Sequence, residues 1–216
     1  IFKVTAKFQG DTIMERGDYL NTIFEDMTAV TTGFDSMDII LKGVDKGFGL
    51  YHLCQELGRQ ASDVVAFGDN LNDMEMLTFA GRAVATENAR DEIKEVADEV
   101  IGHHKDGAVF DTWKDWWAQM SEIKLLALDL DGTLFTKDKQ VTAENRAALK
   151  AAEAKGVHVV ITTGRPLPAI THILEDLGLL DDKHYSVTFN GGLVQRNNGH
   201  NLKDNFTRLK NFKILV

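Results

Sequence analysis

Short, strongly apolar segments alternate with longer amphipathic segments along most of this chain, and this alternation constrains the fold more than any other feature. Val64–Phe67, Lys124–Leu128 and Val157–Ile161 are nearly continuous apolar runs, which are typical of strands buried on both faces of a parallel sheet. Strands that alternate with helices form βαβ units. The sequence therefore predicts an α/β fold with a doubly wound parallel sheet that carries helices on both faces.

Hydrophobic spacing assigns the other elements. Further strands are expected at Phe2–Phe8, Thr28–Thr32, Met37–Leu41, Ala83–Ala85, Glu99–Ile101 and Tyr185–Phe189. Helices are expected at Asp11–Met27, Gly47–Leu57, Asn72–Ala80, Arg90–Val96, Val109–Met120, Ala143–Lys155 and Leu167–Leu177. Beyond these elements the sequence is polar, and Asn197–Gly199 indicates a β-turn.

The charge of the chain narrows the classes of partner. The formal net charge is −9 and the pI is about 5.2, and an acidic surface repels nucleic acid and anionic membranes. No apolar run approaches the ~18 residues of a membrane span, so neither nucleic acid nor a membrane is expected as a partner. The single cysteine, Cys54, cannot form an intrachain disulfide, which fits a cytoplasmic location. A small phosphorylated metabolite fits if the site supplies cations, and the oligomeric state stays open.

An unusual pair of carboxylates follows one of the apolar strands. Asp129 and Asp131 come directly after Lys124–Leu128, and Gly132 then allows a sharp turn. An ordinary acidic turn would explain Asp131 but not Asp129, which stands where the strand should still be apolar. Because ligand sites in parallel α/β sheets lie at the carboxyl ends of the strands, the pair is a candidate active-site motif.

A second polar cluster follows Val64–Phe67 and consists of Asp69, Asn70, Asn72 and Asp73. These residues could cap the next helix, but a cap needs one such residue rather than four. Acidic groups from two strand ends in one crevice repel each other strongly unless a cation lies between them. Carboxylate oxygens suit Mg²⁺, so the sequence predicts a magnesium site.

Two further positions are weaker candidates. Thr163 follows Val157–Ile161 and could bind a phosphate oxygen together with free backbone N–H groups, although it could equally cap a helix. Lys46 stands at the start of a predicted helix, where the helix dipole disfavours a cation unless an anion lies nearby. The alternative for Lys46 is an ordinary exposed lysine.

Taken together, these motifs resemble those of the haloacid dehalogenase (HAD) superfamily of phosphatases, and in particular its Cof-like branch with a type IIB cap. Residues 129–133 resemble the first motif of the family, Thr163–Arg165 the second, Lys46 the third and residues 68–73 the fourth. The resemblance implies a Rossmann-like HAD core with a small α+β cap. It also implies a Mg²⁺-dependent phosphoric monoester hydrolase that acts on sugar phosphates or similar metabolites through an aspartyl-phosphate intermediate.

The same resemblance implies roles for individual residues. Asp129 would be the nucleophile, and Asp131 would serve as general acid and then as general base. Lys46 and Thr163 would bind phosphoryl oxygens. The metal ligands would come from the two acidic motifs, namely Asp129, the backbone carbonyl of Asp131, Asp69 and Asp73 as a ligand or a supporting group. Substrate contacts would come from Arg165, Asn72 and the asparagine-glycine segment that contains Asn190 and Gly191.

The order of the motifs departs from the family, because the third and fourth precede the first and second. This order implies a circular permutation with the native start near Met120. The core is expected at residues 44–192, and residues 1–43 plus 193–216 are expected to form a shortened, partial cap. Alternatives are a phosphomutase of the same superfamily and an inactive permuted scaffold. A phosphoacceptor signalling domain would lack the motifs at residues 131–133 and 68–73.

Overall fold

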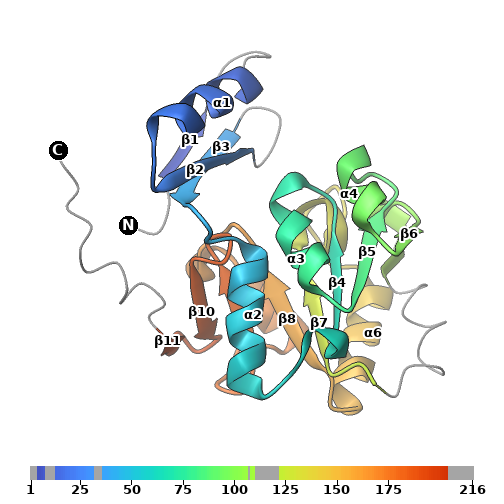
Figure 1. The fold of residues 1–216 in the computed structure, drawn as a ribbon. Coiled ribbons are helices and arrows are strands. Elements are labelled where there is room, and N and C mark those ends of the chain that lie inside the picture. The colour runs from blue at the N-terminus through green and yellow to red at the C-terminus, as the bar shows by residue number, and fades with distance from the viewer. Residues whose placement is uncertain (1–3, 8–12, 32–35, 107, 110–121, 204–216) are drawn as a thin grey trace.

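The computed structural model describes residues 4–7, 13–31, 36–106, 108–109 and 122–203. These residues form two units, a large sheet flanked by helices and a small sheet with one helix (Figure 1). The predicted helix over Val109–Met120 lies almost entirely outside the described residues. Within the described part of the chain, no helix has the length and apolar character needed to cross a membrane.

The large sheet contains eight strands among the described residues, and six adjacent ones run parallel. In spatial order they are β11 (Asn201–Lys203), β10 (Leu193–Arg196), β9 (Tyr185–Thr188), β8 (His158–Thr162), β7 (Leu125–Leu128), β4 (Val64–Gly68), β5 (Arg82–Thr86) and β6 (Glu99–Ile101). β4 and β7 pair in the middle of this sheet, although they are far apart in the sequence. The predicted parallel sheet is confirmed.

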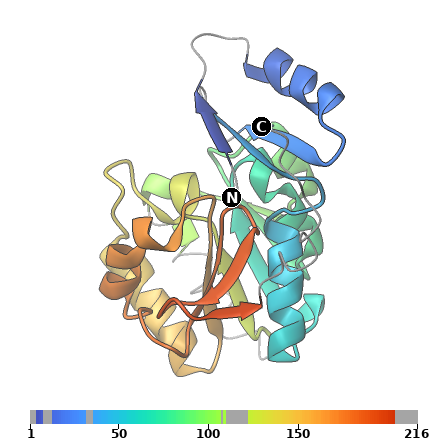
Figure 2. The ribbon, with the colours of Figure 1, turned by 90° about the vertical axis from the view of Figure 1, so that its left-hand side faces the viewer.

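Helices cover both faces of the large sheet, as Figures 1 and 2 show. One face carries α2 (Lys46–Leu57), α3 (Met74–Phe79) and α4 (Asp91–Val96), and the other carries α6 (Ala143–Ala154) and α7 (Thr171–Leu177). Successive strand residues point to opposite faces. In β4, Val64 and Ala66 pack with the first group of helices, whereas Val65 and Phe67 pack with the second. Burial on both faces explains why these strands are continuously apolar.

A small antiparallel sheet forms the second unit, with its strands in the order β1-β3-β2. Its strands are β1 (Val4–Lys7), β2 (Met27–Thr31) and β3 (Ser36–Leu41), and α1 (Ile13–Ile23) packs against them. The predicted helix over Asp11–Met27 is therefore too long at its end. Met27 pairs with Leu41 in the sheet, and the carbonyl of Asp26 accepts the backbone N–H of Lys42 at 3.0 Å, so tertiary pairing overrides the helical spacing.

The chain after β9 corrects one part of the predicted domain division. β10 pairs antiparallel with β9, and β11 pairs with β10, so residues 193–203 extend the large sheet instead of joining the small one. Positive φ angles at Phe189, Asn190 and Gly191 reverse the chain sharply after β9 and make this hairpin possible. The turn predicted at Asn197–Gly199 does occur, but it connects β10 to β11. Residues 204–216 lie outside the described part.

Candidate active site at the ends of the central strands

Asp129 and Asp131 follow β7 directly. The backbone N–H of Asp129 donates to the carbonyl of Phe67 at 3.1 Å, which continues the pairing with β4 by one residue. In the turn that follows, Gly132 has a φ of 93°, and a Cβ at this position would overlap the carboxylate of Asp69. Both the backbone conformation and the close approach therefore require glycine. The turn brings the acidic ends of β7 and β4 together.

Two of the polar residues after β4 cap the next helical turn, whereas Asp69 does not. Asp73 Oδ2 accepts the backbone N–H groups of Asp69 and Asn70, each at 3.0 Å, and Asn70 Oδ1 accepts that of Leu71 at 2.9 Å. Capping thus accounts for Asn70 and for one oxygen of Asp73. The carboxylate of Asp69 instead accepts the hydroxyl of Thr133 at 3.0 Å and so faces the loop after β7.

Lys46 is fully buried between two carboxylates, which excludes the alternative of an exposed lysine. Its Nζ donates to Asp73 Oδ1 and to Asp129 Oδ1, each at 2.5 Å. Burial alone would lower the pKa of Lys46, but the charges of Asp129 and Asp73 outweigh burial and raise it. Asp45 caps α2 by accepting the backbone N–H of Phe48 at 2.7 Å, and this cap fixes Lys46 in the first turn.

Three carboxylates converge beside Lys46, and one oxygen atom from each of Asp69, Asp73 and Asp129 lies within 4.8 Å of the others. Burial and the charges of Asp129 and Asp73 raise the pKa of Asp69 to about 8. Burial also raises the pKa of Asp129 to about 7, although the charge of Lys46 opposes this shift. One ammonium group cannot neutralise three carboxylates, and a site built from oxygen ligands fits a hard divalent cation such as Mg²⁺.

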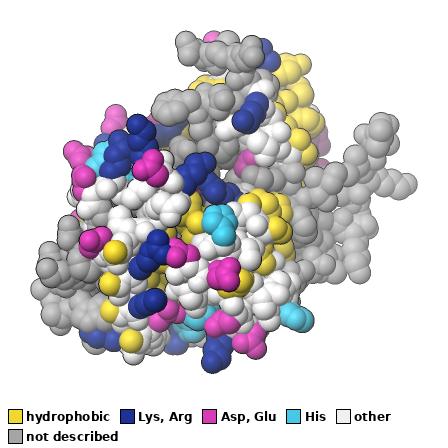
Figure 3. All heavy atoms as spheres, turned by 180° about the vertical axis from the view of Figure 1, so that it is seen from behind, with side chains coloured by type: hydrophobic (Ala, Val, Ile, Leu, Met, Phe, Trp, Pro, Cys, Tyr) yellow, Lys and Arg dark blue, Asp and Glu magenta, His cyan; other side chains and the backbone are white. Residues whose placement is uncertain are grey.

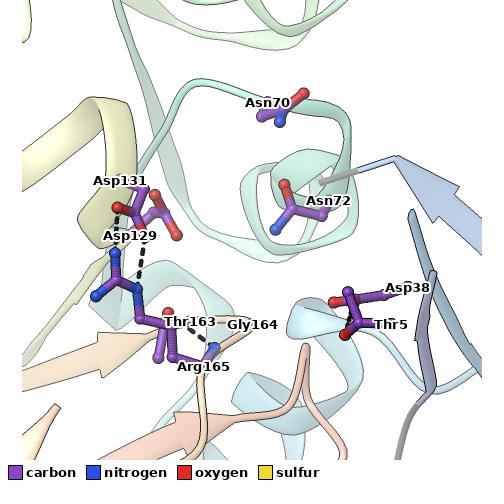
Figure 4. Close-up of a pocket in the computed structure, with 9 residues that line it drawn as sticks. All are labelled: Thr5, Asp38, Asn70, Asn72, Asp129, Asp131, Thr163, Gly164 and Arg165. Carbon is purple, nitrogen blue, oxygen red and sulfur yellow. Dashed lines mark hydrogen bonds and ion pairs between the residues drawn. The ribbon is translucent and has the colours of Figure 1, made fainter. Parts of the chain in front are cut away.

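Arg165 and Thr163 follow β8 and approach the same site. Arg165 forms a two-point ion pair with Asp131, with Nε 2.8 Å from Oδ2 and Nη2 2.5 Å from Oδ1 (Figure 4). The hydroxyl of Thr163 accepts the backbone N–H of Arg165 at 3.2 Å. This bond makes a local turn rather than a helix cap, since the next helical turn begins only at Leu167. The hydroxyl proton of Thr163 therefore remains available to another acceptor.

These residues surround one cavity of about 200 Å³ (Figure 4). Its lining is polar and consists of Thr5, Asp38, Asn70, Asn72, Asp129, Asp131, Thr163, Gly164 and Arg165. Thr5 and Asp38 come from the small sheet and were not predicted as site residues. Asp38 could have been predicted as a site residue, because, like Asp129, it is an acidic residue at a position where the strand pattern is otherwise apolar. Thr5 carries none, since threonine is common in strands.

The remaining predicted substrate contacts lie at the border of this cavity or behind it. Asn72 lines the cavity and donates its side-chain amide to Asn190 Oδ1 at 3.2 Å. Asn190 is buried, and its Nδ2 donates to Asp38 Oδ2 at 2.9 Å. Gly191 has a φ of 88°, and a Cβ there would overlap the carbonyl of Asp45. Gly191 thus allows its loop to pack on the start of α2, outside the cavity lining.

Known proteins are similar to this chain in sequence. A sequence model described as haloacid dehalogenase-like hydrolase matches residues 1–112 and 126–215. The Streptococcus pyogenes protein M6_Spy0533 is 51% identical over 73 residues, which are 34% of this chain and 27% of that protein. The Bacillus subtilis 5-amino-6-(5-phospho-D-ribitylamino)uracil phosphatase YcsE is 42% identical over 77 residues, which are 36% of this chain and 30% of that protein. The chain thus spans less than a third of the length of either curated relative.

A solved structure shares the fold as well. The crystal structure of SMU.1108c from Streptococcus mutans UA159 has a TM-score of 0.51 and 26% identity, and the match covers 55% of this chain and 45% of that one. The two segments matched by the family model contain Lys46 and Asp69 on one side and Asp129 and Thr163 on the other, so every motif of the site lies within them. Because the match extends over most of the sequence, the chain belongs to the haloacid dehalogenase-like hydrolases.

Proposed function

We propose that this chain hydrolyses small phosphomonoesters through a phosphoryl group carried on Asp129. The observation that supports this most directly is the distance of 2.5 Å between Lys46 Nζ and Asp129 Oδ1, inside an acidic cluster beside a polar cavity. A purely structural ion pair would need only one carboxylate. The surplus of acidic groups at this point suits phosphoryl transfer assisted by a cation.

In the first step, an oxygen of Asp129 attacks phosphorus and forms an acyl phosphate while the bond to the leaving oxygen breaks. Lys46 favours the ionised form of the buried nucleophile and orients it by donating to one of its carboxylate oxygens. The ammonium of Lys46 and the hydroxyl of Thr163 would donate to phosphoryl oxygens as their charge redistributes.

Asp131 would transfer the protons. It protonates the leaving oxygen in the first step, and in the second it takes a proton from the water that attacks phosphorus and releases inorganic phosphate. The environments of the two carboxylates suit this division, since the side chain of Asp131 is 50% exposed and that of Asp129 is 8% exposed. Arg165 orients Asp131 through two hydrogen bonds.

Mg²⁺ would bind between the two acidic strand ends, held by Asp69, Asp129 and the backbone carbonyl of Asp131, with Asp73 as a further ligand or a support. When bound, it neutralises part of the charge shared by the nucleophile and the phosphate dianion. The raised pKa values of Asp69 and Asp129 support this assignment, because a cation relieves the repulsion that contributes to them.

The lining of the cavity favours a sugar phosphate or polyol phosphate as substrate. Beyond the acidic cluster it presents Thr5, Asn70 and Asn72, whose side chains can pair with hydroxyl groups of a leaving group. The Bacillus subtilis relative is named for a phosphorylated ribityl compound, which supports the same class.

We further propose that the motif order reflects a circular permutation. The family match falls in two segments, and residues from both, such as Lys46 and Asp129, contribute to one site.

Release of p-nitrophenol from p-nitrophenyl phosphate, measured with and without Mg²⁺, tests the proposed function. Asp91→Asn is a matched control for Asp129→Asn, because the side chain of Asp91 is 96% exposed. We expect Mg²⁺-dependent turnover in the parent and in D91N, and none in D129N. A folded parent without turnover at any Mg²⁺ concentration would contradict the proposal and favour an inactive scaffold. Isomerised sugar phosphate in place of inorganic phosphate would indicate a phosphomutase.

A further inference from the structure

Four polar side chains form a hydrogen-bonded chain that crosses from the small sheet to the large one. Thr5 donates its hydroxyl to Asp38 Oδ1 at 2.7 Å, and Asn190 donates its Nδ2 to Asp38 Oδ2 at 2.9 Å. Asn72 completes the chain by donating to Asn190 Oδ1 at 3.2 Å. Asp38 and Asn190 are each 1% exposed, so this polar chain runs through the interior between the two units.

Chemistry fixes the direction of each of these hydrogen bonds. A carboxylate can only accept, so Thr5 and Asn190 must both donate to Asp38. Because the amide nitrogen of Asn190 faces Asp38, its oxygen faces Asn72. A buried carboxylate that loses a donor is strongly disfavoured, so displacement of the small sheet is costly. The small sheet therefore has one favoured position against the large sheet.

The polar chain also borders the space that a substrate would occupy. Figure 4 shows Thr5 and Asp38 across the cavity from Asp129, with Asn72 between them along one wall. On their other side, Asn72 and Asn190 line a neighbouring cavity of about 320 Å³. The distance between the small sheet and Asp129 therefore sets the width available to a leaving group.

From these contacts we infer that Asp38 is a positioning residue, whose two accepted hydrogen bonds fix the small sheet above Asp129 and so limit the leaving groups that fit. The effect on leaving groups rests on the proposed function. The position of the small sheet does not depend on it.

A reciprocal exchange tests this role. Asn190→Asp places a second carboxylate against Asp38, where no donor remains between them. The double variant D38N/N190D restores the pair in the opposite direction, because the new amide at position 38 donates to the new carboxylate at position 190. Thr5 and Asn72 keep their acceptors in the double variant. The double variant carries the same net charge at positions 38 and 190 as the parent, so its comparison with the parent reports the exchange of partners alone.

Spin labels at Tyr19→Cys on α1 and Glu56→Cys on α2 would measure the distance between the units by pulsed EPR. Both positions are exposed, whereas Cys54 is buried and burial raises its pKa to about 11, so its thiol resists labelling. We expect one narrow distance distribution in the parent and in D38N/N190D, and a broadened or shifted one in N190D. An unchanged distribution in N190D, or a double variant as broad as N190D, would overturn the inference.

A milder variant and a kinetic comparison complete the test. Thr5→Val removes one donor only and should broaden the distribution less than N190D; no broadening in T5V would contradict a role for both hydrogen bonds. Because a displaced small sheet leaves more room for a large leaving group, the ratio of kcat/KM for ribose 5-phosphate to that for acetyl phosphate should rise roughly tenfold in N190D and return to the parent value in the double variant. An unchanged ratio would overturn the effect on leaving groups. If the parent hydrolyses neither compound, the proposed function fails, while the distances still decide the role of Asp38.

Discussion

Beside Asp129 the charged groups are paired and two of them are fully buried, whereas in the small unit several large apolar side chains are exposed. Lys46 and Asp73 are 0% exposed in the first region. In the second, Met14, Tyr19 and Ile23 of α1 are 48%, 65% and 51% exposed. Figure 3 shows apolar side chains gathered along the upper unit, while charged and apolar side chains are interspersed on the larger one.

This difference indicates that the two units have different roles. The proposed phosphoryl transfer needs charged groups fixed in a site with little water, and the large sheet buries and pairs Lys46, Asp73 and Asp129. The small unit has less packing of its own, so its position depends on contacts such as that between Asp38 and Asn190. Substitutions near Asp129 should therefore change the chemistry, and substitutions in the small unit should change selectivity.

The sharpest contrast should come from comparing Asp129→Asn with Tyr19→Ala. D129N removes the nucleophile, and we expect kcat for p-nitrophenyl phosphate to fall by about 10³-fold or more. Tyr19 is exposed on the small unit, and its replacement should change kcat less than about twofold. Equal losses of activity in the two variants would contradict the different roles assigned to the two units.

Lys46→Met should have the next largest effect, and it should act on stability as well as on rate. It leaves buried carboxylates without their cation, which is expected to lower the free energy of unfolding by about 3–5 kcal/mol in the absence of Mg²⁺. Lys42→Met, the same change at an exposed position, should cost less than about 0.5 kcal/mol. Urea denaturation of both variants gives the comparison, and similar midpoints would show that Lys46 does not stabilise the acidic cluster.

Asp131→Asn should separate proton transfer from nucleophilic attack. An alkyl phosphate has a poor leaving group that needs a proton, so we expect kcat to fall by about 10²-fold with ribose 5-phosphate. p-Nitrophenolate leaves without protonation, so the first step with p-nitrophenyl phosphate should be much less affected in a pre-steady-state burst. Equal losses for both substrates would argue against Asp131 as the general acid.

The smallest expected effect concerns pH and Mg²⁺. The pKa of Asp69 is raised from 3.8 to about 8, so the metal-free folded protein binds protons more tightly than the unfolded chain, and its stability falls as pH rises through that window. Mg²⁺ should reverse this loss, with about 2.7 kcal/mol of stabilisation at a hundredfold excess over Kd at pH 8 and clearly less at pH 5. Thermal unfolding at both pH values checks the sign, and a larger Mg²⁺ effect at pH 5 would contradict the assigned cluster.

The site around Asp129 could be predicted from the sequence because each of its motifs is local. Asp69 and Asp129 each follow a short apolar strand, and a parallel sheet brings such strand ends to one edge. The burial of Lys46 was harder to predict, and the only signal was its unfavourable place at a helix N-terminus.

The features that the sequence could not assign depend on contacts between distant segments. Thr5 and Asp38 line the cavity because the small sheet packs over it, and only Asp38 carried a local signal, as an acidic residue in an apolar strand. The strand Leu193–Arg196 was not predicted, and its pairing with β9 depends on the tight reversal at Asn190 and Gly191. The turn predicted at Asn197–Gly199 therefore occurs, but it lies in the large sheet and not in the predicted cap.

Trapping the phosphorylated enzyme tests the central claim most directly. D131N should slow the second step more than the first with p-nitrophenyl phosphate, so the phosphoenzyme should accumulate in the presence of Mg²⁺. Borohydride reduction followed by peptide mass spectrometry identifies the modified residue. We expect modification at Asp129 in D131N and none in D129N. Turnover by the parent without a trapped group on Asp129, or a phosphoryl group on a different residue, would contradict the account.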